Sequence, residues 1–118
     1  MIASLSASQQ AIASHLTRVA GCADNIANAE TDGYKAKRVD IVADAAGNPA
    51  AKITIDQRPG PTRHDYNEKG EPVEVEMSNV DLATEMVNSM TSENAIKANL
   101  KSIAARDELL GELIDTLG

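Results

Sequence analysis

Most of the architecture follows from residues 80–117, whose sequence is VDLATEMVNSMTSENAIKANLKSIAARDELLGELIDTL. Side chains recur along it at heptad spacing, in two lines four residues apart: Leu82, Ser89, Ile96, Ile103, Leu110 and Leu117, and Met86, Glu93, Leu100, Asp107 and Ile114. This pattern is typical of a coiled-coil seam with polar interruptions. A helix of about 36 residues would be roughly 54 Å long. A helix of this length needs a partner to cover its apolar seam.

A second heptad pattern occupies residues 2–29. Its two lines are Ile2, Gln9, Leu16 and Ala23, and Leu5, Ile12, Val19 and Ile26. Gly21 costs a helix about 1 kcal/mol relative to Ala, so we expect another element to approach closely there. The helix should end near residues 29–30, because Thr31 and Asp32 precede Gly33, which can take a positive φ in a turn.

The period changes between the two helices. Apolar residues alternate with polar ones in residues 38–42, 52–56 and 73–77, which predicts three short strands. Residues 44–49, with Gly47 and Pro49, form a hairpin connection between the first two strands. Residues 58–70 hold two prolines and two glycines, and we expect an irregular loop there.

The two ends of the C-terminal helix differ in how well the sequence stabilises them. Ser78 and Asp81 have the spacing of a capping box, in which the Ser78 hydroxyl accepts from the backbone amide three residues on. At the other end, Glu112 and Asp115 place negative charge where the helix dipole favours positive charge. We therefore expect a partner to hold the C-terminal end.

The predicted fold class is mainly α with a small β insert, in which two long antiparallel terminal helices form a coiled coil. Residues 1–33 and 78–118 form the helical core, and residues 34–77 form the β-containing insert. Without Phe or Trp the chain lacks large aromatic core anchors, so we expect an elongated molecule. The two seams should bury Ile12, Leu16, Val19 and Ile26 against Met86, Leu100, Ile103 and Leu110. A second apolar stripe, made of Ala83, Val87, Met90, Leu109 and Leu113, predicts contacts between subunits.

Composition argues against several classes of protein. The net charge is −7 and the eleven Lys and Arg residues are scattered, so we expect no nucleic-acid partner. A single cysteine, Cys22, excludes an intramolecular disulfide. No apolar run reaches the roughly 18 residues that span a bilayer, and residues 1–5 lack the charged start of a cleaved secretory signal.

Two motifs resemble a known family. The first is DNIANAETDGYKAK, Asp24 to Lys37, at the end of the N-terminal helix, and the second is SNVDLATEMVNSMTSENAIKANLKSI, Ser78 to Ile103. Both are similar to signatures of the bacterial flagellar rod, hook and hook-associated axial proteins. HDYNEKGEPVEVEMSNVDL, His64 to Leu82, most resembles the proximal rod subunits of that family.

The resemblance implies a non-enzymatic building block of the flagellar basal body. Such proteins leave the cell through the flagellar type III export apparatus without a cleaved signal peptide and assemble helically into the rod that spans the periplasm. It implies other rod subunits, the chain itself and the export apparatus as partners. The residues that match the motifs are Asn25, Ile26, Ala27, Asn28, Ala29, Gly33, Tyr34, Asn79, Val80, Asp81, Leu82, Glu85, Met86 and Val87. The expected helix seam comprises Leu5, Ile12, Leu16, Val19, Ile96, Leu100, Ile103, Leu110, Ile114 and Leu117.

Several polar residues have two interpretations. Asn25 and Asn28 lie on one face near a helix end, where they either cap the helix or contact a neighbouring subunit. The Tyr34 ring is expected to pack on the helix pair with its hydroxyl at the surface. Glu93 either pairs with Lys97 or sets the register with another chain, whereas Asp107 has no such local partner and is the preferred intersubunit contact.

The sequence gives only weak indications of a catalytic site. His15 and Cys22 are two helical turns apart, about 10.5 Å, which is too far for a thiolate and an imidazole to act together. His64 and Asp65 are adjacent and have no partner at metal-ligand spacing, and Glu74 and Glu76 fall on the solvated side of a strand. We expect no catalytic residue, metal, cofactor or small-molecule substrate. The alternative to a rod subunit is a coiled-coil adaptor or chaperone-like module that binds a partner helix.

Overall fold

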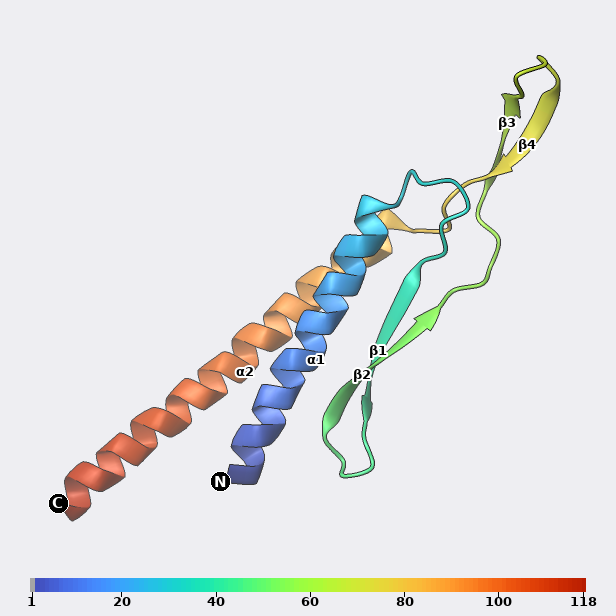
Figure 1. Cartoon of the computed structure of the whole chain (residues 1–118). Coiled ribbons are helices and arrows are strands. Elements are labelled where there is room, and N and C mark those ends of the chain that lie inside the picture. The colour runs from blue at the N-terminus through green and yellow to red at the C-terminus, as the bar shows by residue number, and fades with distance from the viewer. Residues whose placement is uncertain (1) are drawn as a thin grey trace.

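The computed structural model describes residues 2–118, which form two long helices with two β-hairpins between them (Figure 1). In chain order the elements are α1 (Ile2–Ala27), β1 (Lys37–Ala43), β2 (Pro49–Ile55), β3 (Thr62–Tyr66), β4 (Pro72–Glu76) and α2 (Leu82–Leu117). The predicted class, mainly α with a β insert, is confirmed. The molecule measures 83 × 25 × 18 Å and is elongated, as the lack of aromatic anchors predicts. Over the described residues, neither helix combines the length and apolar character needed to cross a membrane.

Helices α1 and α2 lie side by side, and the two chain termini are at the same end of the molecule (Figure 1). Polar side chains join the helices at three levels. The Arg106 guanidinium is 3.4 Å from Ser8 Oγ, His15 Nδ1 is 3.4 Å from Ser92 Oγ, and Arg18 donates to Asn88 Oδ1 at 2.9 Å. As the residue number increases along α1, the residue number of its partner on α2 decreases.

The face of α2 that contacts α1 differs from the expected seam. Its least exposed positions repeat every seven residues in two lines, Ser89, Ile96 and Ile103, and Glu85, Ser92, Asn99 and Arg106. The second line comes three residues after the first instead of four, which turns the centre of the contact face by about half a residue, or roughly 50°. Small and polar side chains therefore meet α1, and larger apolar ones face outward.

The expected burial of the two seams within one chain is accordingly wrong for several residues. The exposed fractions of Leu16, Met86 and Leu100 are 54%, 58% and 52%, and Ile26 and Leu110 are also exposed. Ile12, Val19 and Ile103 are half-buried in the helix contact. Hydrophobic periodicity predicts that the apolar stripe of α2 contacts α1. In the structure, short side chains such as Ser92 occupy the contact instead, which lets the two helices approach closely. The Ser92 hydroxyl also forms a hydrogen bond with His15 of α1.

The first hairpin packs on α1. Strands β1 and β2 pair antiparallel from Lys37↔Ile55 to Ala43↔Pro49, and their connection is the predicted hairpin turn, with Gly47 at φ 84°. A Cβ on Gly21 would lie 2.7 Å from Val39 Cγ2, which confirms the predicted close approach at this glycine. Ser14 Oγ donates to the Pro49 carbonyl at 3.1 Å and holds the other end of the hairpin.

The second hairpin shows that one prediction is wrong. Residues 58–70 were expected to form an irregular loop, but they contain β3, which pairs antiparallel with β4. All five residues of β3 are exposed, so the strand has no apolar alternation to reveal it. Asn67 Oδ1 accepts from the Lys69 and Glu71 amides and closes the turn. Within residues 2–118, this hairpin contacts no other helix or strand and projects from the molecule (Figure 1).

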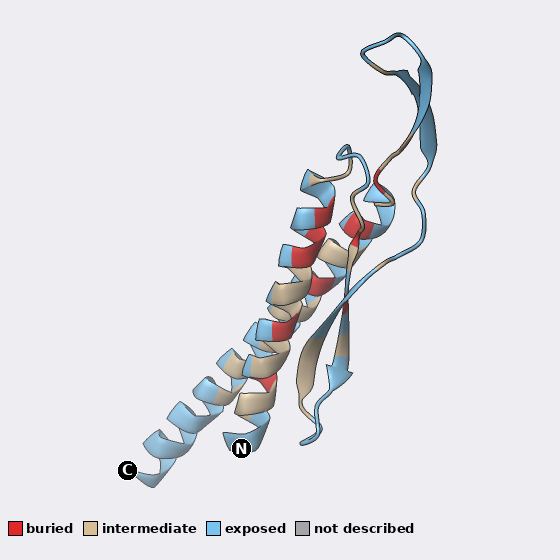
Figure 2. Cartoon of the chain, turned by 45° about the vertical axis from the view of Figure 1, so that its right-hand side comes forward, coloured by how far each residue is buried: buried red, intermediate tan, exposed pale blue. Residues whose placement is uncertain are grey.

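Helix α2 begins at a different cap from the one expected. Asp81 is the N-cap, and its carboxylate accepts from the amides of Ala83 and Thr84. Ser78 Oγ accepts from the Val80 amide instead, so Ser78 shapes the turn that precedes the helix. At its other end, α2 continues through Gly111 beyond the start of α1, and this lower end is fully exposed (Figure 2).

Candidate assembly site

Asn25, near the end of α1, clamps the start of β1. Its side chain is fully buried: Nδ2 donates to the Lys37 carbonyl at 2.7 Å, and Oδ1 accepts from the Lys37 amide at 2.8 Å. The amide group thus pairs with Lys37 as a neighbouring strand would. The two interpretations of Asn25, as a helix cap or an intersubunit contact, are both wrong, because its partners are all within the chain and it is inaccessible.

The neighbours of Asn25 follow the sequence prediction more closely. Asn28 Nδ2 donates to the Asp24 carbonyl at 2.8 Å, which is the predicted capping role. The Tyr34 hydroxyl donates to Asn25 Oδ1 at 3.2 Å, so it points inward and not to the surface as expected. Gly33 has φ +70°, the conformation predicted for the turn after α1.

Asn79, just before α2, clamps the same segment from the other side. Its Oδ1 accepts from the Ala36 amide at 2.7 Å, and its Nδ2 donates to the carbonyls of Asp56 and Arg58, both at 2.9 Å. The two asparagines therefore bind consecutive residues, Ala36 and Lys37. The sequence motifs at the end of α1 and the start of α2 meet at this junction, although periodicity alone gives no sign of it.

Glu76 completes the junction beneath the second hairpin. Its carboxylate forms an ion pair with Lys35 and accepts from the Gly60 amide at 2.9 Å. Both contacts lower the pKa of the Glu76 carboxyl group, and the hydrogen bond from Lys35 has the larger effect. A Cβ on Gly60 would lie 2.1 Å from the Met77 carbonyl oxygen, so only glycine fits against this backbone. The expectation that Glu76 is merely a solvated strand residue is wrong, whereas Glu74 is exposed.

A polar groove of about 320 Å³ lies between α2 and the β1–β2 hairpin, with α1 as its floor. Its charged lining residues are Arg18, Lys37, Arg38, Asp40, Asp56, Arg58 and Glu85. Arg58 holds the pKa of Asp56 down to about 2. Cys22 is buried at the floor; burial, together with a hydrogen bond to Glu85, raises its pKa to about 11. A protonated thiol is a poor nucleophile, so Cys22 serves as a buried packing residue.

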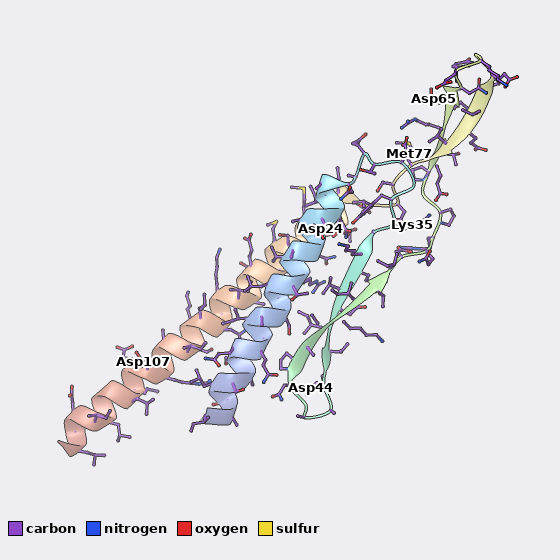
Figure 3. All side chains as sticks on the ribbon, in the orientation of Figure 1. Asp24, Lys35, Asp44, Asp65, Met77 and Asp107 are labelled. Atoms are coloured by element: carbon purple, nitrogen blue, oxygen red, sulfur yellow. The ribbon has the colours of Figure 1, made fainter. Side chains whose placement is uncertain are left out.

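An apolar groove of about 340 Å³ lies at the opposite end of the helix pair. Its lining includes Ile2 and Leu5 of α1 and Leu100, Ile103 and Leu110 of α2. Asp107, the preferred intersubunit contact, is exposed at the edge of this groove and projects from α2 (Figure 3). Glu93 and Lys97 are both exposed.

The remaining predicted residues divide between the helix contact and the surface. Leu5, Ile12, Val19, Ile96 and Ile103 are half-buried; Leu16, Leu100, Leu110, Ile114 and Leu117 are exposed. Of the motif residues, Ala29 and Val80 are half-buried, Glu85 is buried, and Ile26, Ala27, Leu82, Met86 and Val87 are exposed. The exposed members form a surface at the junction end of the helix pair.

Neither histidine pairs with Cys22 in the described part of the chain. Burial and the nearby Arg18 charge lower the pKa of His15, whose ring faces Ser92 and not Cys22. His64 lies on the exposed strand β3. Among the side chains of residues 2–118, no three His, Cys, Asp or Glu side chains gather closely enough to hold a metal ion.

The C-terminal part of the chain is similar to a known family. Residues 74–116 match the family model described as flagellar basal body rod FlgEFG protein C-terminal. The match begins in β4 and covers α2 to Thr116, so it includes the second sequence motif and just over a third of the chain. The match supports a relationship to the flagellar rod and hook family, whose members are structural proteins of the basal body. No curated protein sequence matches the chain significantly.

Proposed function

We propose that this chain is a structural subunit of the bacterial flagellar rod, which assembles helically through its terminal helices into the axial drive shaft. The observation that carries the proposal is the match of residues 74–116 to the rod family, on a helix whose apolar side chains stay exposed. The largest of these side chains are Leu82, Met86, Val87, Met90, Leu100, Leu109, Leu110, Leu113, Ile114 and Leu117. Burial of each would contribute roughly 1.5–3 kcal/mol, which favours association.

Within the rod, the chain is proposed to occupy the proximal region as a FlgC-like subunit. The support is the similarity of His64 to Leu82 to proximal rod proteins. In this proposal the chain leaves the cell through the flagellar type III export apparatus, keeps its N-terminus and becomes part of the rod that crosses the periplasm.

We propose that the two parts of the chain occupy different layers of the rod. The helical core of the rod contains an antiparallel coiled coil made of residues 1–33 and 78–118. Residues 34–77 then form the outer, β-containing part. The clamps at Asn25 and Asn79 support this division, because they hold the start of β1 against both helices and set the angle of the insert.

The motif residues are proposed to act in two groups. Asn25, Asn79 and Asp81 shape the subunit, since their side chains bind its own backbone. Leu82, Met86 and Val87 contact neighbouring subunits, because their side chains are exposed on the first two turns of α2. Helix-seam residues that remain exposed, such as Leu100, join the same contact surface.

Isolation of basal bodies from the encoding bacterium tests the proposal. A tagged chain should co-purify with the rod and crosslink to other rod subunits, and a deletion strain should not swim. Leu100→Asp should abolish assembly, because it places a charge on a surface that becomes buried. Leu100 is exposed in the monomer, so this variant should still fold. Glu74→Gln, on the exposed face of β4, is the matched control and should restore swimming.

Two results would contradict the rod assignment: absence of the chain from purified basal bodies, and normal swimming of the deletion strain. The adaptor alternative predicts a closed complex of fixed size, whereas a rod subunit forms open-ended contacts. Sizing the purified chain over a range of concentrations separates these two outcomes.

A further inference from the structure

The C-terminal half of α2 separates its positive and negative charges into two consecutive segments. Residues 97–106 contain three basic residues and no acidic one. Residues 107–117 contain four acidic residues and no basic one. The helix therefore changes from basic to acidic at a single point, between Arg106 and Asp107.

Five of these charged residues share one side of the helix, which we call the charged face: Lys97, Lys101, Glu108, Glu112 and Asp115. At 100° per residue they fall within roughly 60° of one another around the helix axis. The positions that contact α1 lie on the opposite side, and all five side chains are exposed at this open end of α2 (Figure 2). Within residues 2–118, none of the ion pairs includes any of them. The charged face thus has no charge partner inside the chain.

The charges are placed symmetrically about the midpoint of residues 104–105. Lys101 and Glu108 are each three and a half residues from this midpoint, or roughly 5 Å along the helix axis. Lys97 and Glu112 are each seven and a half residues from it, or roughly 11 Å. Every lysine of the charged face therefore has a glutamate at the same distance on the other side of the midpoint.

We propose that two copies of the chain pair antiparallel through their charged faces, about a two-fold axis at this midpoint. Lys97 of each copy then lies opposite Glu112 of the other, and Lys101 lies opposite Glu108. The alanines at 104 and 105 are at the crossing point, where small side chains let the two helix axes approach closely. The inference concerns the free chain and goes beyond the proposed rod function.

Charge complementarity selects the antiparallel orientation. In a parallel pair in register, lysines face lysines and glutamates face glutamates, which repels the two copies. A parallel pair shifted by three turns brings the lysines of one copy to the glutamates of the other, but the remaining charges of both copies stay unpaired. Only the antiparallel pair matches all the lysines and glutamates of the charged face at once.

The rest of the molecule leaves room for this pair. Helix α1 lies between α2 and the β1–β2 hairpin (Figure 1), so the insert is on the far side of α2 from the charged face. With the axis at residues 104–105, the two helices overlap over residues 92–117, roughly 39 Å, and the two inserts lie at opposite ends of the pair. Leu82, Met86 and Val87 are outside the overlap, so the pair leaves them free for the contacts proposed in the rod.

The pair should be sensitive to salt, because each exposed ion pair contributes little and is screened. In sedimentation equilibrium, the dimer should dissociate at least about tenfold more readily at about 0.5 M than at about 0.02 M ionic strength. Apolar contacts are not screened in this way. Sizing at high salt therefore tests the open-ended association of a rod subunit without interference from the pair.

Charge reversals test the contact itself. Lys97→Glu with Lys101→Glu makes the charged face wholly acidic, and Glu108→Lys with Glu112→Lys makes it mainly basic. Each double variant alone should dimerise at least about tenfold more weakly than the wild type at low salt, because like charges meet. An equal mixture of the two should regain the dimer, since every altered side chain then faces an opposite charge.

The matched control changes the same amount of charge elsewhere. Lys52 and Lys69 are exposed lysines of the insert, and neither belongs to an ion pair within residues 2–118. Lys52→Glu with Lys69→Glu should dimerise as the wild type does.

Disulfide crosslinking tests the orientation. In a Cys22→Ala background, Ala105→Cys should link two copies on oxidation, because the two residues meet at the axis. Asn94→Cys is exposed on the same side of α2, but its two copies would be separated by roughly 32 Å along the pair. It should therefore not link, whereas a parallel pair in register would link at both positions.

Three results would overturn the proposal: a mixture of the charge-reversed variants that does not regain the dimer, equal crosslinking at Ala105→Cys and Asn94→Cys, or a wild type that stays monomeric at low salt. The rod function is judged independently by the presence of the chain in purified basal bodies. If the chain is found there and the free chain does not pair, only the antiparallel contact is refuted.

Discussion

The Asn25 side chain forms the two backbone hydrogen bonds with Lys37 that a neighbouring strand would otherwise form. Its amide pairs with both the amide and the carbonyl of Lys37 and also accepts from the Tyr34 hydroxyl. A buried backbone group that loses its partner is costly, so this residue should contribute strongly to stability. Asn79 plays the same part for Ala36, and together the two amides hold the insert to the helices.

Asn25→Ala should lower the free energy of unfolding by about 1–3 kcal/mol, because it leaves the Lys37 backbone groups without partners in a buried site. Urea denaturation followed by circular dichroism measures the change. Asn94→Ala, at an exposed position of α2, is the control and should stay within about 0.5 kcal/mol of the wild type. Equal effects of the two substitutions would show that the clamp contributes nothing.

Gly21→Ala should destabilise the protein by about 1–3 kcal/mol, because the added Cβ meets Val39 Cγ2 at 2.7 Å. Val39→Ala in the same chain should recover part of the loss by removing the clashing methyl groups. Gly111→Ala is the matched control: its Cβ enters open space, and the better helix propensity should raise stability by up to about 1 kcal/mol. Thermal melts of the four proteins decide the point, and a loss at Gly111 as large as that at Gly21 would contradict it.

At the scale of elements, the contact between α1 and α2 is held by polar groups. Ser8, Arg18 and His15 of α1 bind side chains of α2, and Ser92 is fully buried between the helices. Ile12, Val19 and Ile103 are half-buried in this contact, but several other apolar side chains expected there, such as Met86 and Leu100, are exposed. The helix pair is therefore sensitive to the protonation of the histidine at its centre.

Acidification should weaken the helix pair through His15. Its pKa in the folded chain lies below the ordinary value of 6.5, so the unfolded chain binds more protons as the pH falls below this value. Stability should therefore be constant between about pH 7 and 8 and decrease as the pH falls below about 6.5. Urea denaturation at a series of pH values measures this change.

His15→Gln should remove the decrease over this interval. His64→Gln, on the exposed strand β3, should leave it in place. The carboxyl groups of Asp56 and Glu76, whose pKa values are lowered, act only at more acidic pH. A decrease that persists in His15→Gln would mean that another group is responsible.

At the scale of the whole molecule, the contacts that hold the fold together and the exposed end of α2 lie in different parts of the chain. The junction and the α1–α2 contact occupy one end and the middle of the molecule, whereas residues 107–118 contact little of it (Figure 2). A long helix end with exposed leucines is costly to leave in water, so its interactions belong to the assembled state.

Deletion of residues 107–118 should leave the melting temperature within about 2 °C of the full chain, because every residue removed is exposed. The same deletion should abolish self-association in sedimentation velocity. Deletion of the exposed turn residues 68–69 is a control that should keep association. A truncated chain that unfolds would show that residues 107–118 stabilise the monomer, and one that still associates would place the contact elsewhere.

Local patterns in the sequence determined much of the fold. Heptad spacing predicted both helices, alternation predicted β1, β2 and β4, and Gly21 and Gly33 correctly marked a close approach and a turn. These features depend on neighbours within a few residues, so periodicity and glycine conformation are sufficient to detect them. Strand β3 was missed because both its faces are in water, and water imposes no alternation.

Only the tertiary structure decided which face of α2 meets α1 and what the motif asparagines do. Hydrophobic patterning cannot distinguish an apolar stripe that packs within the chain from one reserved for other copies, since both satisfy the same period. The partners of Asn25 and Asn79 lie 9 to 43 residues away, and hydrogen bonds over such separations leave no periodic trace in the sequence. The sequence predicted the long helix and an outward-facing apolar stripe on it, which includes Val87 and Met90. Only the tertiary structure showed that seam residues such as Met86 and Leu100 are exposed as well, because small and polar side chains take part in the contact with α1.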